Sequence, residues 1–170
     1  MFSLLSLIIS LLYSTTKSFV VINGDINHQK PYYISSKISD KHKLWIMDAM
    51  SIVEPFNMLY TQEYFSNDCI RIHYSTLRYT GFTDFNGYLL SNNKWVIDKI
   101  SIGINPNIDV YNAFISIILH ELLHSVGLMH SDVQNSIMNM SIYVVNGAVS
   151  DVEYPFLHQD DIAGLLELSE

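Results

Sequence analysis

One stretch of eleven residues, 120–130, constrains this chain more than any other feature, and it reads HELLHSVGLMH. Its first two histidines, His120 and His124, are four residues apart and therefore lie on one face of a helix, where both imidazoles can reach a single metal ion. Gly127 follows three residues later, and a glycine there can adopt a positive φ and end the helix. The resulting turn allows His130 to return to the same ion.

The same stretch carries a carboxylate that is poorly placed to be a ligand. Glu121 follows the first histidine directly, and it suits a general base that takes a proton from zinc-activated water. Three protein ligands leave the fourth position of a zinc ion open to water, which is typical of a catalytic zinc site and not of a structural one. We therefore predict one catalytic Zn²⁺, held by His120, His124 and His130, with Glu121 as the base.

The motif resembles that of the metzincin metalloproteases. Ser131, directly after the third histidine, resembles the matrixin branch, the matrix metalloproteinases; astacin-like members tend to have Glu there and adamalysin-like members Asp. Met138, eight residues after His130, is similar in spacing to the methionine of the matrixin Met-turn, which lies beneath the zinc. Residues 158–166 resemble the matrixin closing helix. The resemblance is strong over 109–170.

This resemblance implies a fold of the α+β class, metzincin or zincin-like. Such a fold has a mixed, twisted sheet, a backing helix, a zinc-binding helix, a Met-turn and a C-terminal helix. It also implies a zinc-dependent endopeptidase that hydrolyses peptide bonds in protein or peptide substrates, as matrixins do in the extracellular matrix. In matrixins, paired acids at the positions of Asp160 and Asp161 tie the closing helix to the mature N-terminus and to the Met-turn. The alternative is that they form an ordinary acidic first turn, favoured by the helix dipole.

Two residues are candidates for substrate binding by the same resemblance. Ser116 lies one helical turn before His120, where matrixins often close the floor of the S1′ pocket. Because serine is small, the pocket would run deep, unless Ser116 merely packs against the sheet. Met140 stands where matrixins usually have proline, and its flexible side chain can fill or vacate a pocket.

Composition favours one folded domain. The chain has 170 residues, of which 49% are hydrophobic and 15% charged, which is enough for a sizeable core. The net charge of −8 argues against a nucleic-acid partner, which would need a basic face. We expect a monomer.

The first residues indicate secretion. Residues 1–12 are apolar apart from serine, a run too short for a membrane helix of about 20 residues. Small residues at Thr16 and Ser18 would allow cleavage after Ser18. We predict a signal peptide at 1–18, a short segment at 19–30 and the catalytic domain at 31–170. A buried first strand or an uncleaved anchor is the alternative. No later stretch is long enough to span a membrane.

Patterning predicts the remaining elements. Residues 31–38 indicate a strand and 41–54 an amphipathic helix, with an N-cap at 39–40 and Pro55 at its end. Asp109 is expected to cap the zinc helix. The other predictions are a strand at 69–74, a turn-rich loop at 81–87, an edge strand at 88–90 and a strand at 95–104.

Other candidate ligands are few. No histidine lies between His73 and His120, so we expect the second, structural zinc of matrixins to be absent. The calcium sites of the same loop are doubtful for this reason, with Asp84 and Asp98 as the remaining candidates. The other histidines have no ligand-like spacing and are predicted to be surface or cap residues: His28, His42, His73 and His158.

The single cysteine, Cys69, cannot form an internal disulfide. It could be a free thiol or an intermolecular link, but its place at the start of a strand favours a small buried side chain. It lacks the motif that surrounds the propeptide cysteine of matrixin zymogens, so we do not expect that form of latency. Asn139 begins a glycosylation sequon by its letters.

Two other functions are compatible with the motif. The first is a catalytically silent zinc-binding protein, such as a decoy or an inhibitor-binding module. Glu121 argues against it, because metal binding alone does not need that carboxylate. The second is a metzincin of another branch, which Ser131 and the spacing to Met138 disfavour.

Overall fold

A computed structural model describes residues 24–25, 31–56, 61–62, 64–66, 69–76, 80–89, 95–139 and 156–168. The predicted signal peptide and Met140 lie outside these residues. The elements follow the chain in this order: β1 (Gly24–Asp25), β2 (Tyr32–Ile34), α2 (Asp40–Val53), a 3₁₀ turn η1 (Glu54–Phe56), β3 (Ile70–Tyr74), β4 (Gly81–Leu89), β5 (Trp95–Ile104), α3 (Tyr111–Ser125) and α4 (Gln159–Leu168).

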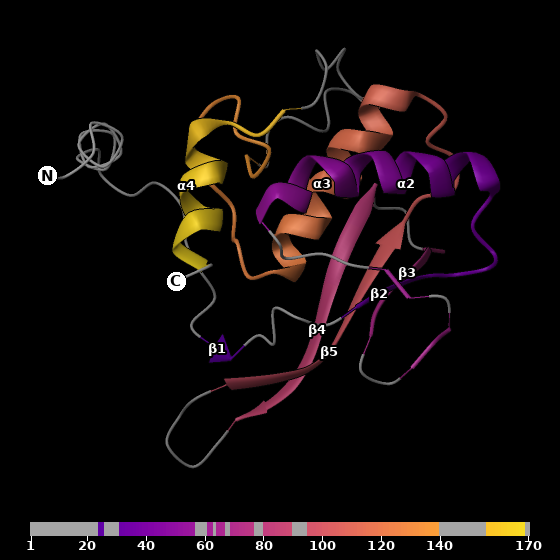
Figure 1. Ribbon diagram of the computed structural model, residues 1–170, viewed down its shortest axis with the longest axis horizontal. Helices are drawn as coiled ribbons and strands as arrows, with labels where there is room; N and C mark the ends of the chain where they lie inside the picture. Colours follow the sequence, from indigo (N-terminus) through magenta and orange to yellow (C-terminus); the bar gives the residue numbers. More distant parts are fainter. Residues whose placement is uncertain are drawn as a thin grey trace, which may run out of the picture.

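The sheet is mixed and has five strands, with β5 at its centre. On one side, β5 pairs in parallel with β1 near its start and with β3 towards its end, and β3 pairs in parallel with β2. On its other side, β5 pairs antiparallel with β4. The predicted α+β fold with a mixed, twisted sheet is confirmed (Figure 1).

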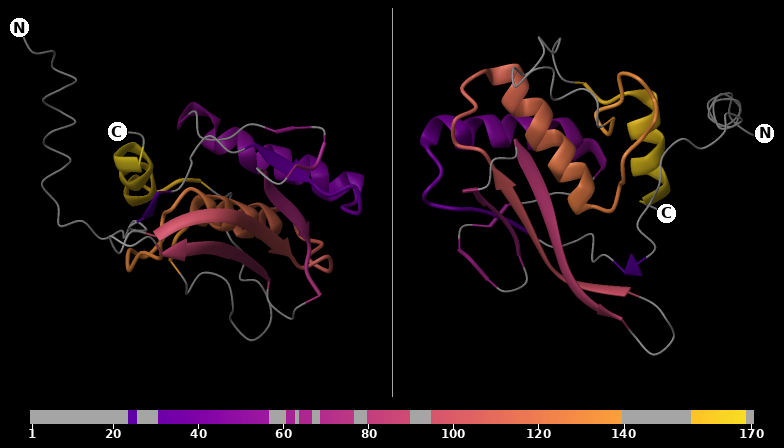
Figure 2. Two further views of the ribbon diagram at one scale, coloured as in Figure 1. Left: turned by 90° about the horizontal axis from the view of Figure 1, so that it is seen from below. Right: turned by 180° about the vertical axis from the view of Figure 1, so that it is seen from behind.

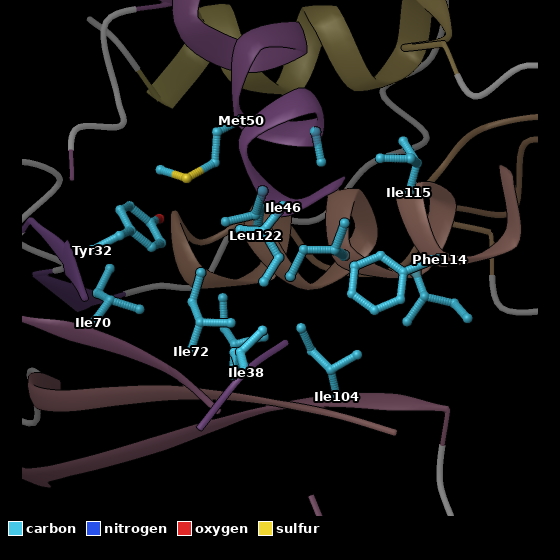
Figure 3. Close-up of a cluster of buried hydrophobic side chains, with 14 of the residues drawn as sticks. Tyr32, Ile38, Ile46, Met50, Ile70, Ile72, Ile104, Phe114, Ile115 and Leu122 are labelled. Carbon is cyan, nitrogen blue, oxygen red and sulfur yellow. The ribbon is translucent and has the colours of Figure 1, made fainter. Parts of the chain in front are cut away.

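Helices α2 and α3 cover one face of this sheet, and α4 stands at one end of the molecule (Figure 1). Helix α2 begins where the Ser39 side chain accepts a hydrogen bond of 3.3 Å from the backbone N–H of His42. It ends at Val53, just before Pro55, because proline has no N–H to continue the helix. Side chains from α2, α3 and the strands point toward one another in a shared core (Figure 3).

The prediction of a loop at 81–87 is wrong. The whole of 81–89 is a strand that pairs with β5, with Gly81 opposite Ile104 and Thr83 opposite Ile102. The register shifts between Asn86 and Gly87, as expected where glycine allows a bulge. The backbone pairing with the long strand β5 outweighs the tendency of Gly, Asp and Asn to form turns. Strands β4 and β5 curve together (Figure 2).

Two boundaries also differ from the prediction. The strand predicted at 31–38 is only three residues long, because the chain turns after Ser35, whose carbonyl accepts from the N–H of Ile38 at 3.0 Å. Asp109 does not cap the zinc helix. The N-cap of α3 is Val110, which makes no side-chain cap hydrogen bond, and Asp109 instead pairs with Lys41 of α2.

Within the described residues, no helix combines the length and the apolar character that a membrane span requires.

Candidate metal centre

Three histidines meet beside α3. His120 and His124 come from the second half of this helix, and His130 comes from the loop after it. One ring nitrogen of each lies within 4.8 Å of the others, and the Nε2 atoms of His124 and His130 are 3.2 Å apart. With Zn–N bonds of about 2.0–2.1 Å, two ligands of a tetrahedral zinc are roughly 3.3 Å apart. This spacing therefore fits zinc.

Backbone carbonyls fix the orientation of both helical histidines. The Nδ1 of His120 donates to the carbonyl of Ile137 at 2.7 Å, and the Nδ1 of His124 donates to the carbonyl of Leu128 at 2.7 Å. A carbonyl can only accept, so each Nδ1 carries the proton and each Nε2 keeps its lone pair. Hydrogen bonds from the ring nitrogen that does not bind the metal set the tautomer of a metal-binding histidine in this way.

Burial also keeps these rings neutral. It lowers the pKa of His120 to about 3 and that of His124 to about 4, and it lowers the pKa of His130. Desolvation disfavours the charged imidazolium, and only the neutral ring offers a lone pair to a metal. The three histidines therefore fit a divalent cation with a preference for nitrogen ligands.

The turn that brings His130 back is built as the sequence predicts. Gly127 has a φ of 105°, a left-handed conformation that glycine adopts without steric cost. The N–H of Gly127 donates to the carbonyl of His124 at 2.8 Å, and that of Leu128 donates to the carbonyl of Leu123 at 3.0 Å. This pair of bonds is a Schellman motif, so the helix ends directly after its second metal-binding residue.

A buried carboxylate holds the loop around Met138. Asp161, at the start of α4, is 1% exposed and accepts four hydrogen bonds. Its donors are the Ser136 hydroxyl (2.5 Å) and the backbone N–H groups of Ile137 (3.0 Å), Met138 (3.4 Å) and His158 (2.8 Å). Met138 itself is fully buried. Asp161 thus joins α4 to the loop that the sequence assigns to the Met-turn.

The neighbouring acid holds the third histidine's loop. Asp160 accepts a hydrogen bond of 2.6 Å from the hydroxyl of Ser131, and the backbone N–H of Ser131 donates to the carbonyl of Met138 at 2.9 Å. The predicted tie of the paired acids to the mature N-terminus involves residues that are not described.

Glu121 lies on α3 among buried groups and is 6% exposed. Burial raises the pKa of its carboxyl to about 7, although a hydrogen bond from Thr83 opposes the rise. The Thr83 hydroxyl lies 2.7 Å from Oε2 of Glu121. The sequence does not reveal Thr83, because the Gly, Asp and Asn residues around it predict a loop. Only the pairing of β4 with β5 could have indicated that it faces α3.

The two substrate-binding candidates are not tested by the structure. Ser116 is fully buried, and its hydroxyl donates to the carbonyl of Asn112 one turn earlier in α3, at 2.9 Å. Its place at the floor of a pocket stays a prediction. Met140 is outside the described residues.

The remaining histidines differ from one another. His42 is not a surface or cap residue: it is 5% exposed and stacks on Phe114 with a centroid distance of 4.3 Å. His158 is a cap residue as predicted, since its Nδ1 accepts from the backbone N–H of Asp160 at 3.2 Å. His73 is a half-buried residue of β3, and His28 is not described.

Cys69 is buried, and its thiol donates to the carbonyl of Ser66 at 3.0 Å, which agrees with the prediction of a small buried side chain. The side-chain amide of Asn139 is largely buried and donates to the carbonyl of Val133 at 3.0 Å. An amide held in this way is poorly accessible for glycosylation.

Of the two calcium candidates, Asp84 is an exposed residue of β4, and its carboxylate accepts from the Asn86 side chain at 3.2 Å. The side chain of Asp98 is not described.

The sheet, its two covering helices and the three convergent histidines define a zinc metalloprotease of the metzincin type. The sequence model of the matrixin family matches residues 28–169, and the chain belongs to the matrixin family.

A solved structure with a similar fold is high choriolytic enzyme 1 (HCE-1), a hatching enzyme zinc-protease from Oryzias latipes, the medaka fish. The TM-score is 0.53 at 18% sequence identity, over 86% of this chain and 92% of that one. At this identity the likeness shows the fold alone. A search of curated proteins gives no match to this chain.

Proposed function

We propose that this chain is a zinc-dependent endopeptidase that hydrolyses peptide bonds in protein substrates outside the cell. One observation carries the proposal. Three neutral histidines converge on one point, and a buried carboxyl group that is not among them follows the first on the same helix.

The reaction needs a water molecule, a base and a polarised carbonyl. When bound to the three histidines, zinc supplies a Lewis acid that activates water and polarises the scissile carbonyl. Glu121 takes the proton of the attacking water and passes it to the leaving amine. The carbonyls of Ile137 and Leu128 hold the Nδ1 protons of His120 and His124, which keeps their Nε2 atoms available throughout.

The competing proposal is a zinc-binding protein that does not cut. It would retain the histidines but has no use for a buried carboxyl group whose desolvation is costly. The hydrogen bond from Thr83 to Glu121 favours the enzyme, since it maintains a carboxylate that metal binding does not require. We also propose that the protein is secreted and acts as a monomer.

The decisive experiment is Glu121→Gln. We expect peptide hydrolysis on a broad fluorogenic library to fall by about 10²–10⁴-fold, the usual contribution of a general base. Metal analysis should still find one zinc per chain. The matched control, His130→Ala, should lose both zinc and activity, as should the parent protein treated with a chelator.

Wild-type turnover by zinc-loaded Glu121→Gln would rule out the mechanism. A zinc-loaded parent that cleaves no peptide in the library would favour the silent zinc-binding protein. Two tightly held zinc ions per chain would contradict the expected single site.

A further inference from the structure

Strand β4 approaches α3 unusually closely at Glu121. Gly81 and Thr83 are two residues apart and therefore point to the same face of the strand. A Cβ atom placed on Gly81 would lie 2.7 Å from Cγ2 of Ile117 and 3.0 Å from Oε1 of Glu121. A larger residue at position 81 would therefore displace the side chains of Ile117 and Glu121. The glycine thus lets the strand come close enough for Thr83 to reach Glu121.

The Thr83 hydroxyl has two acceptors within reach, both on Glu121. The carboxylate oxygen Oε2 is 2.7 Å away, and the backbone carbonyl oxygen is 3.0 Å away. A hydroxyl carries one proton, and a charged acceptor forms the shorter and stronger bond. When Glu121 is ionised, as a general base must be, the proton is therefore directed to its carboxylate.

We propose that Thr83 is a positioning residue, which fixes the Glu121 carboxylate in the orientation that the reaction requires. The inference rests on the proposed role of Glu121 as the general base. A glutamate has three side-chain torsions, and Glu121 is only 6% exposed, so bulk water contributes little to holding its carboxylate in one orientation. Small misplacements of a reacting group can cost about 100-fold in rate, so a single donor at 2.7 Å has a measurable effect.

The test compares Thr83→Val, which keeps the shape of the side chain without its hydroxyl, with Thr83→Ser, which keeps the hydroxyl. We expect Thr83→Val to lower kcat by about 10- to 100-fold, with KM changed less than about twofold and zinc affinity unchanged. Thr83→Ser should restore most of the loss. A merely structural contact between β4 and α3 would not give this pattern of rescue.

Wild-type kcat in Thr83→Val would overturn the inference, as would a loss that Thr83→Ser shares or a loss explained by weaker zinc binding. Failure of the proposed function is distinct: there, the zinc-loaded parent itself cleaves nothing.

In that case a second measurement, which does not depend on enzymatic activity, tests the contact between Thr83 and Glu121. It is a double-mutant cycle in denaturant on zinc-loaded parent, Thr83→Val, Glu121→Ala and the double variant. We expect non-additive unfolding free energies, the sign of a direct bond between the two side chains. Additive effects would overturn the inference.

Discussion

The residues that the structure describes form two hydrophobic cores, which are stabilised in different ways. The larger core lies between the sheet, α2 and the first half of α3 and consists mainly of isoleucine with aromatic residues (Figure 3). The smaller core lies under the metal centre. It contains Val53, Leu119, Leu123, Val126, Leu128, Ile137, Met138 and Leu165.

The difference lies in the backbone that each core must bury. In the larger core the backbone is mostly in helices and strands, whose polar groups pair with one another, and only Ile38 and Ile108 of its buried residues lie in loops. Part of the smaller core is loop, over 126–139, and buried loop N–H groups need acceptors from elsewhere. Asp161 is the acceptor for Ile137, and for Met138 it shares this role with the Ser136 hydroxyl oxygen. The larger core thus distributes its stability over many apolar contacts, whereas the loops of the metal centre depend on two neighbouring carboxylates, Asp160 and above all Asp161.

The strongest way to break this comparison is Asp161→Ala. It leaves the Ser136 hydroxyl and the backbone N–H groups of Ile137 and His158 without their acceptor, whereas the N–H of Met138 keeps the Ser136 hydroxyl oxygen at 3.0 Å. Each buried donor left unpaired costs about 1–3 kcal/mol, so we expect a loss of about 3–5 kcal/mol in denaturant titration. Asp161→Asn, which keeps one oxygen acceptor, should lose less.

The same variant should weaken zinc binding by about 10–100-fold, because the peptide that Asp161 holds also carries the carbonyl bonded to His120. A stability loss within the ~0.3–1 kcal/mol of a helix-dipole effect would make Asp161 an ordinary acid of a first turn.

The sequence predicted what local patterns determine. Apolar spacing predicted α2, β3 and β5 to within a few residues, because apolar residues recur on the buried face of each. Helix α3 is buried on all sides over Ala113–Ser125, and its long apolar run indicated it. The metal motif placed the three histidines together, and Gly127 marked the helix end, because both depend on the geometry of one helix and one turn.

The misses have a common cause, which is contact between distant segments. Strand β4 depends on its pairing with β5, and the position of Thr83 follows from that pairing. Asp109 could cap α3 by its place in the sequence, but it lies near Lys41 of another helix. The burial of His42 depends on partners 32 and 66 residues away, Tyr74 and Ile108.

His42 is a titratable group buried beside the larger core. It tests whether the stability of that core depends on pH. Its Nε2 donates to the carbonyl of Ile108 at 3.1 Å, and its Nδ1 accepts from the Tyr74 hydroxyl at 2.8 Å. Burial lowers its pKa, and nearby Lys41 lowers it further, while the bond to Ile108 and the charge of Asp109 oppose the shift. The folded state therefore binds this proton less readily than the unfolded state.

A folded pKa below the unfolded value of about 6.5 gives stability that is complete above pH 6.5 and is lost as the pH falls below it. We expect the parent to lose up to about 1.4 kcal/mol per pH unit from this group. His42→Gln should lose less between pH 7 and pH 5, measured by urea titration at saturating zinc. The other histidines are shared by both proteins, so their effects cancel in the difference. If the unfolding free energies of the parent and His42→Gln fell in parallel with pH, the lowered pKa of His42 would be contradicted.

The smallest expected effect concerns the start of the zinc helix. This end of α3 packs against the larger core and has no side-chain cap. Val110 is the N-cap of α3, has an extended backbone (φ −101°, ψ 121°) and is 65% exposed. Val110→Ser places a hydroxyl where it can accept from the first turn. Relative to Val110→Ala, we expect a gain of about 0.5–1 kcal/mol in thermal or denaturant unfolding.

Asp109→Ala is the matched control at the neighbouring position. Because the Asp109 side chain is 83% exposed and pairs with Lys41 at the surface, its removal should leave the unfolding midpoint unchanged. A clear fall for Asp109→Ala, with no gain for Val110→Ser over Val110→Ala, would mean that Asp109 caps the helix in solution. If the prediction holds, the helix that carries His120 and His124 forms without an N-terminal side-chain cap, and its position depends on the apolar packing of the larger core.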